Sequence, residues 1–458
     1  MRLITSKRFY KNTIAIAIPI ALQNLITYGT SMMDTIMLGR ADDTGTLLSA
    51  SSLANQPFFL LSLICFGLSG ASLVLSSQYW GKRDLKAVRL IYSIILKVAF
   101  TISFLMAAVV LIFPEWVMGL YSNNSDIIAA GAQYLRILGW AYVFFGVENT
   151  MLCSIRSVEL VKISVVVNMT SFCMNVFLNW VLIFGNLGAP ALGIQGAAIA
   201  TLAARLSEFV ITFVYLFFID KRLRFRPKDF LLFDITMAKD LFKHGLPVLL
   251  NEMFWSLGIT MQAAILGHIS YSAGDPVAAN SIASMIQQLS TVAIFGISNA
   301  SGVVIGKSIG EKRLEDAKRQ ADTFIAMGIV VGAIACAFIL VMKNIVVGFY
   351  TVPDETKELA RQLITVIAFV TFFSSMSSVE IVGILRGGGD TRFCLWAEML
   401  ALWAAAIPLA FCASTFLQWS VPVVLMCMKI DEPIKVIASL IRILKGKWIR
   451  ELTRENIA

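Results

Sequence analysis

Seven ionisable residues lie inside apolar stretches of the sequence, and they are the first candidates for chemistry. A charge within a membrane span costs about 2.5–3.5 kcal/mol on insertion scales, so such a residue predicts a function. We expect two of the seven, Lys97 and Glu208, to pair with neighbours or to reach the membrane surface. Two others, Glu148 and Glu380, either pair with a following arginine or face the interior. The seven residues are Asp34, Lys97, Glu148, Glu208, Glu252, Glu380 and Glu398.

Asp34 is the strongest of these candidates. It stands among apolar neighbours in Met-Met-Asp-Thr-Ile-Met, close to Gly39 and so toward the outer half of the first span. Gln23 falls on the same helical face. Such an acid could bind and release a proton or a sodium ion. Alternatively, Asp34 is an interfacial acid that pairs with Arg40.

Uncharged polar residues in the fifth and sixth spans are further candidates. Asn175 and Asn179 stand one helical turn apart and therefore share a face. Their amides could offer oxygen atoms to a cation or hydrogen bonds to a substrate, or they could join neighbouring helices. Thr201 lies in the Gly-Ala-Ala-Ile-Ala-Thr stretch of the next span, where packing is the alternative to ion binding.

The elements that must position these residues are membrane-spanning helices. Of the 458 residues, 58% are hydrophobic and 15% are charged, against about 25% charged in soluble domains. Apolar stretches of about 20 residues, long enough to cross a bilayer, recur along the chain, and the expected fold is an all-α polytopic membrane protein with twelve transmembrane helices. The last span is interrupted by Lys429, Asp431, Glu432 and Lys435 and is either partly interfacial or packed against protein. The predicted spans are 12–38, 48–76, 88–113, 128–153, 160–185, 193–219, 246–270, 278–306, 323–350, 360–385, 394–415 and 418–442.

An internal repeat divides these spans into two pseudo-symmetric six-helix lobes. Phe66-Gly67-Leu68-Ser69 aligns with Phe295-Gly296-Ile297-Ser298 at an offset of 229 residues, and Gly81 then aligns with Gly310. The predicted domains are an N-lobe at 1–219, a cytoplasmic linker at 220–245, and a C-lobe at 246–458 with a short cytoplasmic tail. An even number of spans in each half places the repeat axis along the membrane normal. Two such lobes around a central cleft favour a carrier that rocks between two states.

The aligned halves differ in their ionisable residues. At an offset of 228, Asp34 aligns with Gln262, and Glu252 aligns with Asn24. Asp34 of the first half and Glu252 of the second half therefore stand at different positions of the repeat. This asymmetry predicts unequal roles for the two lobes.

The net charge of +9 is concentrated in alternate loops and in the tail. By the positive-inside rule this pattern predicts that both termini are cytoplasmic, in a multi-pass protein of the cell (inner) membrane. It also argues against nucleic acid as a partner. Gly302-Val-Val-Ile-Gly306-Lys307-Ser308 has one residue too few for a phosphate loop, and neither histidine has metal-ligand spacing. We therefore expect a monomeric transporter with no enzymatic activity, metal site or cofactor.

Several motifs resemble the multidrug and toxic compound extrusion (MATE) family over nearly the full length. They are the Gln23…Asp34-Thr-Ile-Met-Leu-Gly39 pattern, Gly81-Lys-Arg-Asp with Gly310-Glu-Lys-Arg, Asn175-x3-Asn179, Leu192-Gly-Ile-Gln-Gly-Ala-Ala-Ile-Ala-Thr201 and Ile384-Leu-Arg-Gly-Gly-Gly-Asp390-Thr. The resemblance implies export of small amphiphilic or cationic drugs in exchange for H⁺ or Na⁺ across the lipid bilayer. It also implies a cation-coupling site in the N-lobe at Asp34, Asn175, Asn179 and Thr201, and another in the C-lobe at Glu252.

The sequence departs from the family pattern at two positions. Asn179 stands where one branch has an aspartate, and Ser375 falls near the span-ten acid of the sodium-coupled branch. Glu252 then lacks its partner unless Glu380 substitutes, which leaves both H⁺ and Na⁺ open as the coupling ion. Candidates for the substrate cleft are Gln23, Gln262, Ser375 and Glu380. The alternative function is a lipid-linked precursor flippase of a related fold, although such a cleft should carry several basic residues and only Lys97 lies well inside a span.

Overall fold

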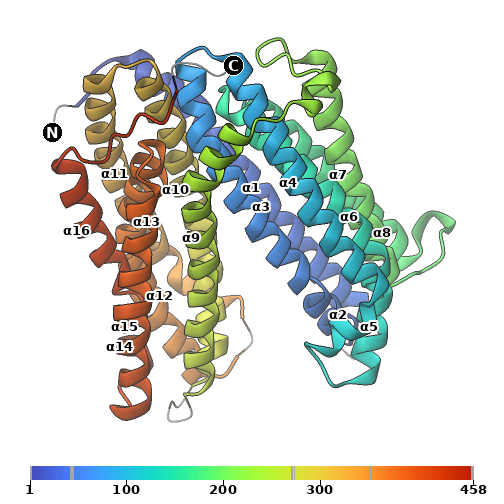
Figure 1. The fold of residues 1–458 in the computed structure, drawn as a ribbon. Helices are drawn as coiled ribbons and strands as arrows, with labels where there is room; N and C mark the ends of the chain where they lie inside the picture. Colours follow the sequence, from blue (N-terminus) through green and yellow to red (C-terminus); the bar gives the residue numbers. More distant parts are fainter. Residues whose placement is uncertain (1–2, 42–45, 270–271, 273, 351, 455–458) are drawn as a thin grey trace. The chain divides into compact units, whose positions relative to one another are not determined.

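The computed structural model describes residues 3–41, 46–269, 272, 274–350 and 352–454, and within these ranges it contains helices and no strand. Long helices run side by side (Figure 1). Apolar runs continue through several turns and so produce these long elements, even though two of the helices have an internal proline, Pro19 and Pro247. In the first half the helices are α1 (Lys7–Ala41), α2 (Thr46–Ala54), α3 (Gln56–Gly81), α4 (Leu85–Ile112), α5 (Pro114–Gly119), α6 (Ser125–Ser157), α7 (Lys162–Phe184), η1 (Asn186–Gly188), α8 (Ile194–Val214) and η2 (Tyr215–Ile219).

The second half repeats this succession of long helices. After the short turn η3 (Pro227–Leu231), the helix α9 already begins at Ile235, so residues 235–245 of the predicted linker are helical. The helices are α9 (Ile235–Gly267), α10 (Pro276–Gly310), α11 (Leu314–Gly348), α12 (Asp354–Ser378), η4 (Val379–Leu385), α13 (Thr391–Glu398), η5 (Met399–Ala406), α14 (Ile407–Phe411), η6 (Cys412–Phe416), α15 (Val421–Met428) and α16 (Asp431–Leu444).

All twelve predicted spans fall largely on helix. Ten helical stretches in the described residues are long and apolar enough to cross a membrane. The other two are α9, which carries buried polar residues, and the last span, which is broken into α15 and α16 at Lys429 and Ile430. The predicted fold class, an all-helical polytopic protein, is confirmed.

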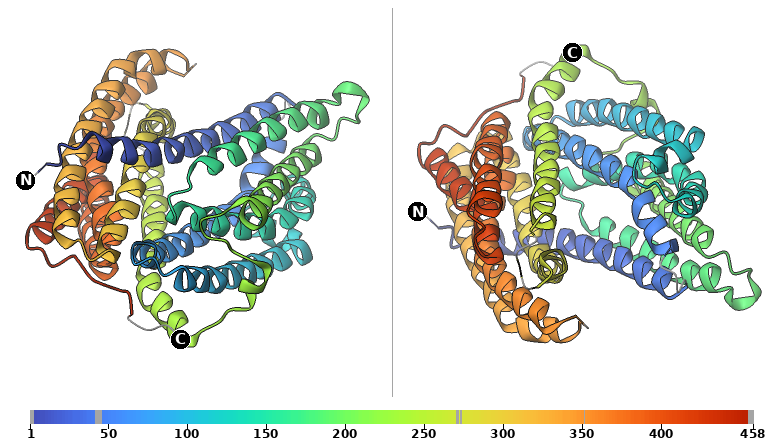
Figure 2. Two further views of the ribbon diagram at one scale, coloured as in Figure 1. Left: turned by 90° about the horizontal axis from the view of Figure 1, so that it is seen from above. Right: turned by 90° about the horizontal axis from the view of Figure 1, so that it is seen from below.

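The chain folds as two compact units. We call Leu22–Ser76 with Leu85–Leu241 the N-terminal unit, and Met1–Ala21 with Ser77–Asp84 and Phe242–Ala458 the C-terminal unit. The core of the N-terminal unit is built on α2, α3, α4, α6 and α8. In the C-terminal unit α10, α11 and α12 pack together (Figure 2). The predicted lobe boundaries stay a prediction.

The last helix of the C-terminal unit has an unusual distribution of side chains. On α16 the buried face carries Asp431, Lys435 and Ser439, whereas Ile437 and Leu444 are 60% and 69% exposed. A helix with polar residues inside and apolar residues outside suits lipid rather than water as its surroundings. The charges that interrupt span twelve are therefore packed against protein, which was one of the two alternatives from the sequence.

The repeat is visible where the ends of α3 and α10 meet in the C-terminal unit. A Cβ on Gly81 would clash with the carbonyl oxygen of Lys307, and a Cβ on Gly310 would clash with that of Gln78. Gln78 and Lys307 are separated by the same 229 positions as the two glycines. The contact of Gly81 with Lys307 is thus repeated by the aligned pair, Gly310 with Gln78, as a local twofold relation requires. Only glycine permits this approach of the two backbones.

The C-terminal tail packs onto the same region. Trp448 is buried, and the backbone N–H of Arg450 donates to the carbonyl oxygen of Gly388 at 2.8 Å. Its guanidinium group pairs with the fully buried Asp390 at 2.6 Å. The Gln78 side chain accepts from the backbone N–H of Leu452 at 2.9 Å. The tail is therefore part of the C-terminal unit rather than a free extension.

Candidate functional site

A polar stripe runs along one face of α7. Its residues follow the three- and four-residue spacing of a helical face, so they share one side of the helix. The side chain of Asn179 donates to Asn175 Oδ1 at 3.1 Å, which confirms that the two amides are adjacent. The stripe is buried and consists of Ser164, Asn168, Ser171, Asn175 and Asn179.

The carboxylate of Asp34 on α1 faces this stripe. Asp34 Oδ1 accepts a hydrogen bond from Asn179 Nδ2 at 2.5 Å, within the N-terminal unit. Asn175 is also within interaction range of the carboxylate. The structure thus pairs Asp34 with amides of α7 rather than with Arg40, which was the alternative from the sequence. A hydrogen bond to a charged acceptor is stronger than a neutral one, so this contact orients the carboxylate.

Oxygen atoms from three helices gather near Asp34. The Oδ1 atom of the fully buried Asn179 has no hydrogen-bond partner among the described residues. On α8, Thr201 lies beside the hydroxyl of Tyr134, which accepts from Asn55 Nδ2 at 3.3 Å. Carboxylate, amide and hydroxyl oxygens are the ligands that hard cations prefer. The group can therefore hold a proton on Asp34 or offer oxygen ligands to a metal cation.

A close approach of α7 and α8 positions Thr201. A Cβ on Gly196 would lie 2.6 Å from the carbonyl oxygen of Leu182, so a larger residue would separate the two helices. Gly196 belongs to the Gly-Ala-Ala-Ile-Ala-Thr stretch that ends at Thr201. The small residues of this stretch thus allow two polar helical faces to meet.

Further charges of the N-terminal unit lie around the Asp34 group. Arg205 pairs with Glu208 at 2.8 Å and interacts electrostatically with Asp34, and Glu148 is buried nearby. Arg156 donates to Gln23 Oε1 at 3.0 Å. The expected pairing of Glu208 is confirmed, and Lys97 donates to the carbonyl oxygen of Leu232 at 2.8 Å, as expected of a residue that finds a partner. When ionised, the carboxylates of this group, Asp34, Glu148 and Glu208, carry three negative charges. Two positive charges, those of Arg156 and Arg205, lie with them, so one negative charge is in excess.

Glu252 in the C-terminal unit has a different environment. Its carboxylate pairs with the guanidinium group of Arg386 at 2.7 Å, and the same group donates to Asn251. The sequence offered a following arginine, which is Arg386, as a possible partner of Glu380 and did not predict this pair. The repeat contained the signal: Arg386 aligns with Arg156, and Asn251 aligns with Gln23, which Arg156 binds.

The other predicted residues of the C-terminal unit are buried and do not bind Glu252 through any hydrogen bond or ion pair that the described residues form. Ser375 donates to the carbonyl oxygen of Gly328 at 2.8 Å. Gln262 donates to the carbonyl oxygen of Met428 at 2.8 Å and accepts from Lys429 at 2.8 Å. Glu380 accepts from Ser439. Arg386, not Ser375 or Glu380, is therefore the partner of Glu252.

Lys435 is the centre of a second buried ionic group that the sequence did not predict. Its ammonium nitrogen lies 2.9 Å from Asp431, 3.0 Å from Glu432 and 3.4 Å from Glu398. The side chain is 3% exposed. We call the set formed by Glu380, Glu398, Lys429, Asp431, Glu432, Lys435 and Ser439 the α16 cluster.

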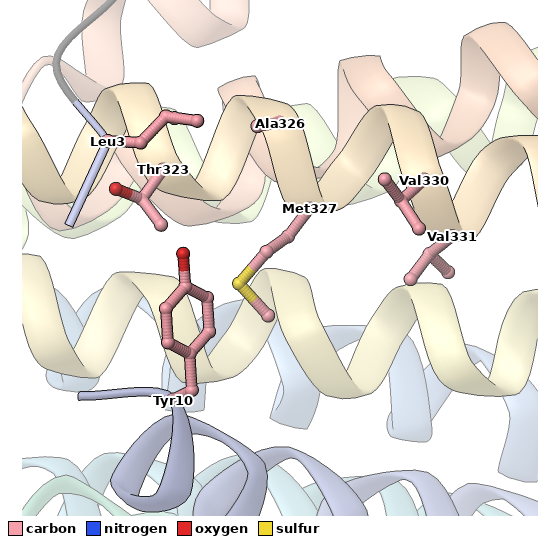
Figure 3. Close-up of a pocket in the computed structure, with 7 residues that line it drawn as sticks. All are labelled: Leu3, Tyr10, Thr323, Ala326, Met327, Val330 and Val331. Atoms are coloured by element: carbon pink, nitrogen blue, oxygen red, sulfur yellow. The ribbon is translucent and has the colours of Figure 1, made fainter. Parts of the chain in front are cut away.

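The C-terminal unit also has an apolar groove between its N-terminal segment and α11, with a volume of about 280 Å³. Figure 3 shows the side chains that line it, among them Tyr10, Thr323 and Met327. None of the predicted site residues belongs to this lining. The groove is therefore separate from the Asp34 group.

A profile of the MatE family matches residues 19–181 and 247–412. The chain is 24% identical over 452 residues to the probable multidrug resistance protein NorM of Thermotoga maritima, covering 98% of this chain and 95% of the relative. It is 23% identical to the multidrug resistance protein MdtK of Photorhabdus laumondii, over 87% of this chain and 86% of the relative.

Solved structures share the fold at low sequence identity. A mutant of the Vibrio cholerae MATE transporter VcmN superposes with a TM-score of 0.86 at 15% identity, covering 96% of this chain and 98% of the other. The eukaryotic MATE transporter AtDTX14 superposes with a TM-score of 0.82 at 15% identity, covering 96% of each chain. These likenesses concern the fold of the whole chain, including both repeats.

Proposed function

The chain belongs to the MatE family, and we propose on that premise that it exports amphiphilic or cationic organic compounds in exchange for H⁺ or Na⁺. It is a multi-pass membrane transporter and not an enzyme. Relatives named as multidrug resistance proteins support drug-like substrates. Antiport and the choice of ion are parts of the proposal.

The observation that carries the proposal is the hydrogen bond from Asn179 to Asp34, inside a buried group of three carboxylates and only two guanidinium groups. A lone excess charge in a buried polar group favours a bound counter-ion. A proton on Asp34 or a sodium ion among the oxygens of Asp34, Asn179 and Thr201 would neutralise it. The same group can therefore be loaded by an ion gradient.

Coupling follows if the loaded and unloaded forms favour different conformations of the carrier. A ligand shifts a conformational equilibrium only by its differential affinity for the two states. A gradient of one pH unit supplies about 1.4 kcal/mol for each proton that enters. A substrate cation that favours the unloaded form would leave as the ion binds, and the two events would then alternate.

The expected setting is the cell (inner) membrane with both termini in the cytoplasm. The support is the alternation of basic loops with loops that are nearly free of basic residues, apart from the mixed loop at 353–361. The transporter works as a monomer in this proposal, since each chain carries both repeats.

Transport by reconstituted protein tests the proposal. Purified protein in liposomes receives a proton gradient or a sodium gradient separately, and export of a fluorescent organic cation is followed. We expect one of the two gradients to drive export in the wild type and neither gradient to do so in Asp34→Asn. The matched control is Asp126→Asn, because Asp126 is an exposed acid of the same unit. Export by Asp34→Asn at the wild-type rate would contradict the assignment of Asp34.

A further inference from the structure

The polar segment between η2 and α9 is packed along α4 and does not project freely from the N-terminal unit. We call residues 220–234 the connecting segment. Arg89 Nε donates to the carbonyl oxygen of Leu223 at 2.8 Å, and Lys97 Nζ donates to that of Leu232 at 2.8 Å. The eight positions from Arg89 to Lys97 cover about 12 Å of helix, since each residue adds about 1.5 Å. The connecting segment therefore follows α4 from its beginning into the predicted span.

Three phenylalanine rings fix the connecting segment to the end of a membrane span. Phe217 lies in the last turn of the helical stretch that ends at Ile219. Its ring centroid is 5.8 Å from that of Phe225 and 5.5 Å from that of Phe230, and these two are 5.3 Å apart. Phe225 and the neighbouring Leu223 are fully buried. The segment is thus anchored at the membrane surface by an apolar cluster of its own.

The basic side chains of the segment face away from this cluster. Arg224 stands between the buried Leu223 and Phe225 and is exposed, and Arg226 and Lys228 after it are exposed as well. The segment thus presents a row of cations on its outer side. We call the exposed cations Lys221, Arg224, Arg226 and Lys228 the basic strip.

The acids of the segment do not neutralise the basic strip through ion pairs. Asp220 accepts from the backbone N–H of Leu223 at 2.8 Å, Asp229 from that of Arg226 at 2.7 Å, and Asp234 from that of Met237 at 2.6 Å. No carboxylate of the described residues forms an ion pair with the strip. Five basic residues against three acids also leave the segment positively charged. The strip can therefore receive an anion from outside the chain.

Large apolar side chains are exposed directly after the basic strip. Leu231 is 85% exposed and Phe233 is 60% exposed. The ring of Phe233 lies 5.6 Å from Lys97 Nζ, beside the part of α4 that belongs to the predicted span. Two such residues together would be unfavourable in water but suit the boundary between headgroups and acyl chains. The segment thus combines cations with an apolar tip at the membrane edge.

This combination favours one class of partner. Arginine and lysine bind phosphate oxygens through charge-assisted hydrogen bonds. A zwitterionic headgroup would bring its own cation to the strip, whereas an anionic headgroup would not. A soluble phosphate would match the strip but would leave the apolar tip without a partner.

We propose that the connecting segment is a binding site for anionic phospholipid, in which the basic strip binds phosphate oxygens and Leu231 and Phe233 lie among the acyl chains. The site is on the N-terminal unit, outside the Asp34 group, and it does not depend on which ion drives transport. Basic segments beside a membrane gain affinity from anionic lipids in this way.

Lipid binding to the purified full-length protein tests the basic strip. The protein in detergent is titrated with phosphatidylglycerol or phosphatidylcholine, and bound lipid is measured by native mass spectrometry. Each basic residue at such a surface contributes about fivefold in affinity. Replacing all four strip residues by glutamine should therefore weaken phosphatidylglycerol binding about tenfold or more and leave phosphatidylcholine binding unchanged.

The matched control removes four exposed cations from the C-terminal unit. These are Lys312, Arg313, Lys318 and Arg319, of which Arg313 and Lys318 already pair with acids. Glutamine at these four positions should leave phosphatidylglycerol binding close to that of the wild type. An equal loss in both sets of variants, or a wild type without preference for phosphatidylglycerol, would overturn the proposal.

The apolar tip distinguishes a lipid from a soluble anion. Leu231→Gln combined with Phe233→Gln should weaken phosphatidylglycerol binding, and it tests the site independently if the strip variant does not fold. Phe113→Gln with Leu120→Gln is the control, because these exposed apolar residues lie toward the other end of α4. If inorganic phosphate displaced the lipid and the tip variant bound it like the wild type, the strip would be a site for soluble anions, and the lipid proposal would be refuted.

Discussion

The two arginines that the repeat aligns make a direct comparison between the two units. Arg156 binds Gln23 in the N-terminal unit, and Arg386 binds the aligned Asn251 in the C-terminal unit. The next residue after each amide differs, because Asn24 is neutral and Glu252 is an acid that adds an ion pair to Arg386. The repeat thus preserves the polar contact while the charge changes.

The acids of the two units differ in how their negative charge is compensated. Asp34 is held by amides, which hydrogen-bond a carboxylate without neutralising it, whereas Glu252 is neutralised by a guanidinium group. A group must be able to change its charge to exchange ions, and an acid in an ion pair loses more on protonation than one held by amides. Two repeats with the same helical arrangement can therefore hold one acid that exchanges ions and another that stabilises the structure.

The largest effect should come from replacing one acid at a time by the corresponding amide. Asp34→Asn should abolish gradient-driven export, while Glu252→Gln should retain export, because Arg386 keeps its contact with Asn251. Initial rates in proteoliposomes measure both. Equal losses in the two variants would remove the functional difference between the units.

The two arginines should differ in their effect on stability. Arg386→Gln should lower the free energy of unfolding by about 2–3 kcal/mol, because it leaves the partly buried carboxylate of Glu252, which is 25% exposed, without its cation. Arg156→Gln should cost less, since its hydrogen bond is to the neutral Gln23 and the nearby buried acid Glu148 keeps Arg205 as a counter-charge. Thermal unfolding in detergent compares them. A larger loss for Arg156→Gln would reverse the comparison.

The close approach of α3 and α10 at Gly81 and Gly310 tests whether the two repeats pack in the same way. Gly81→Ala and Gly310→Ala should each cost about 1–3 kcal/mol, because either Cβ forces α3 and α10 apart. Gly119→Ala is the control, since no atom lies near its Cβ position. Thermal unfolding should give similar losses for the two mates. A loss in only one of them would contradict a local twofold relation.

The smallest effect should come from a single hydroxyl near Asp34. Thr201→Ala should raise the ion concentration for half-maximal export by about tenfold or less, the equivalent of one hydrogen bond or oxygen ligand. Thr101→Ala, which removes an exposed hydroxyl on α4, is the control. Ion titrations of export measure the shift. A complete loss of export in Thr201→Ala would require a central role for this residue.

Local sequence patterns predicted much of the fold and part of the site. The apolar stretches predicted the spans, and the spacing of Asn175 and Asn179 predicted one polar face, which the hydrogen bond between them confirms. Both inferences depend on the helical period and on the length needed to cross a bilayer. Neither requires knowledge of which helices are neighbours.

The ionic partners could not be predicted in the same way. Arg386 lies 134 positions from Glu252, and Lys435 lies 37 positions from Glu398. The charges of α16 looked like an interruption of an apolar span, yet they lie on its buried face. Only packing decides which charge a buried side chain meets.

The sequence by itself determined twelve helical spans, the repeat and the presence of acids at unequal positions in its halves. These features follow from hydropathy and period, which act along the chain. The tertiary structure decided that Asp34 meets amides, that Glu252 meets Arg386 and that Glu380 meets Ser439. Ionisation inside a membrane depends on partners within a few ångströms, and residues distant in the sequence supply those partners.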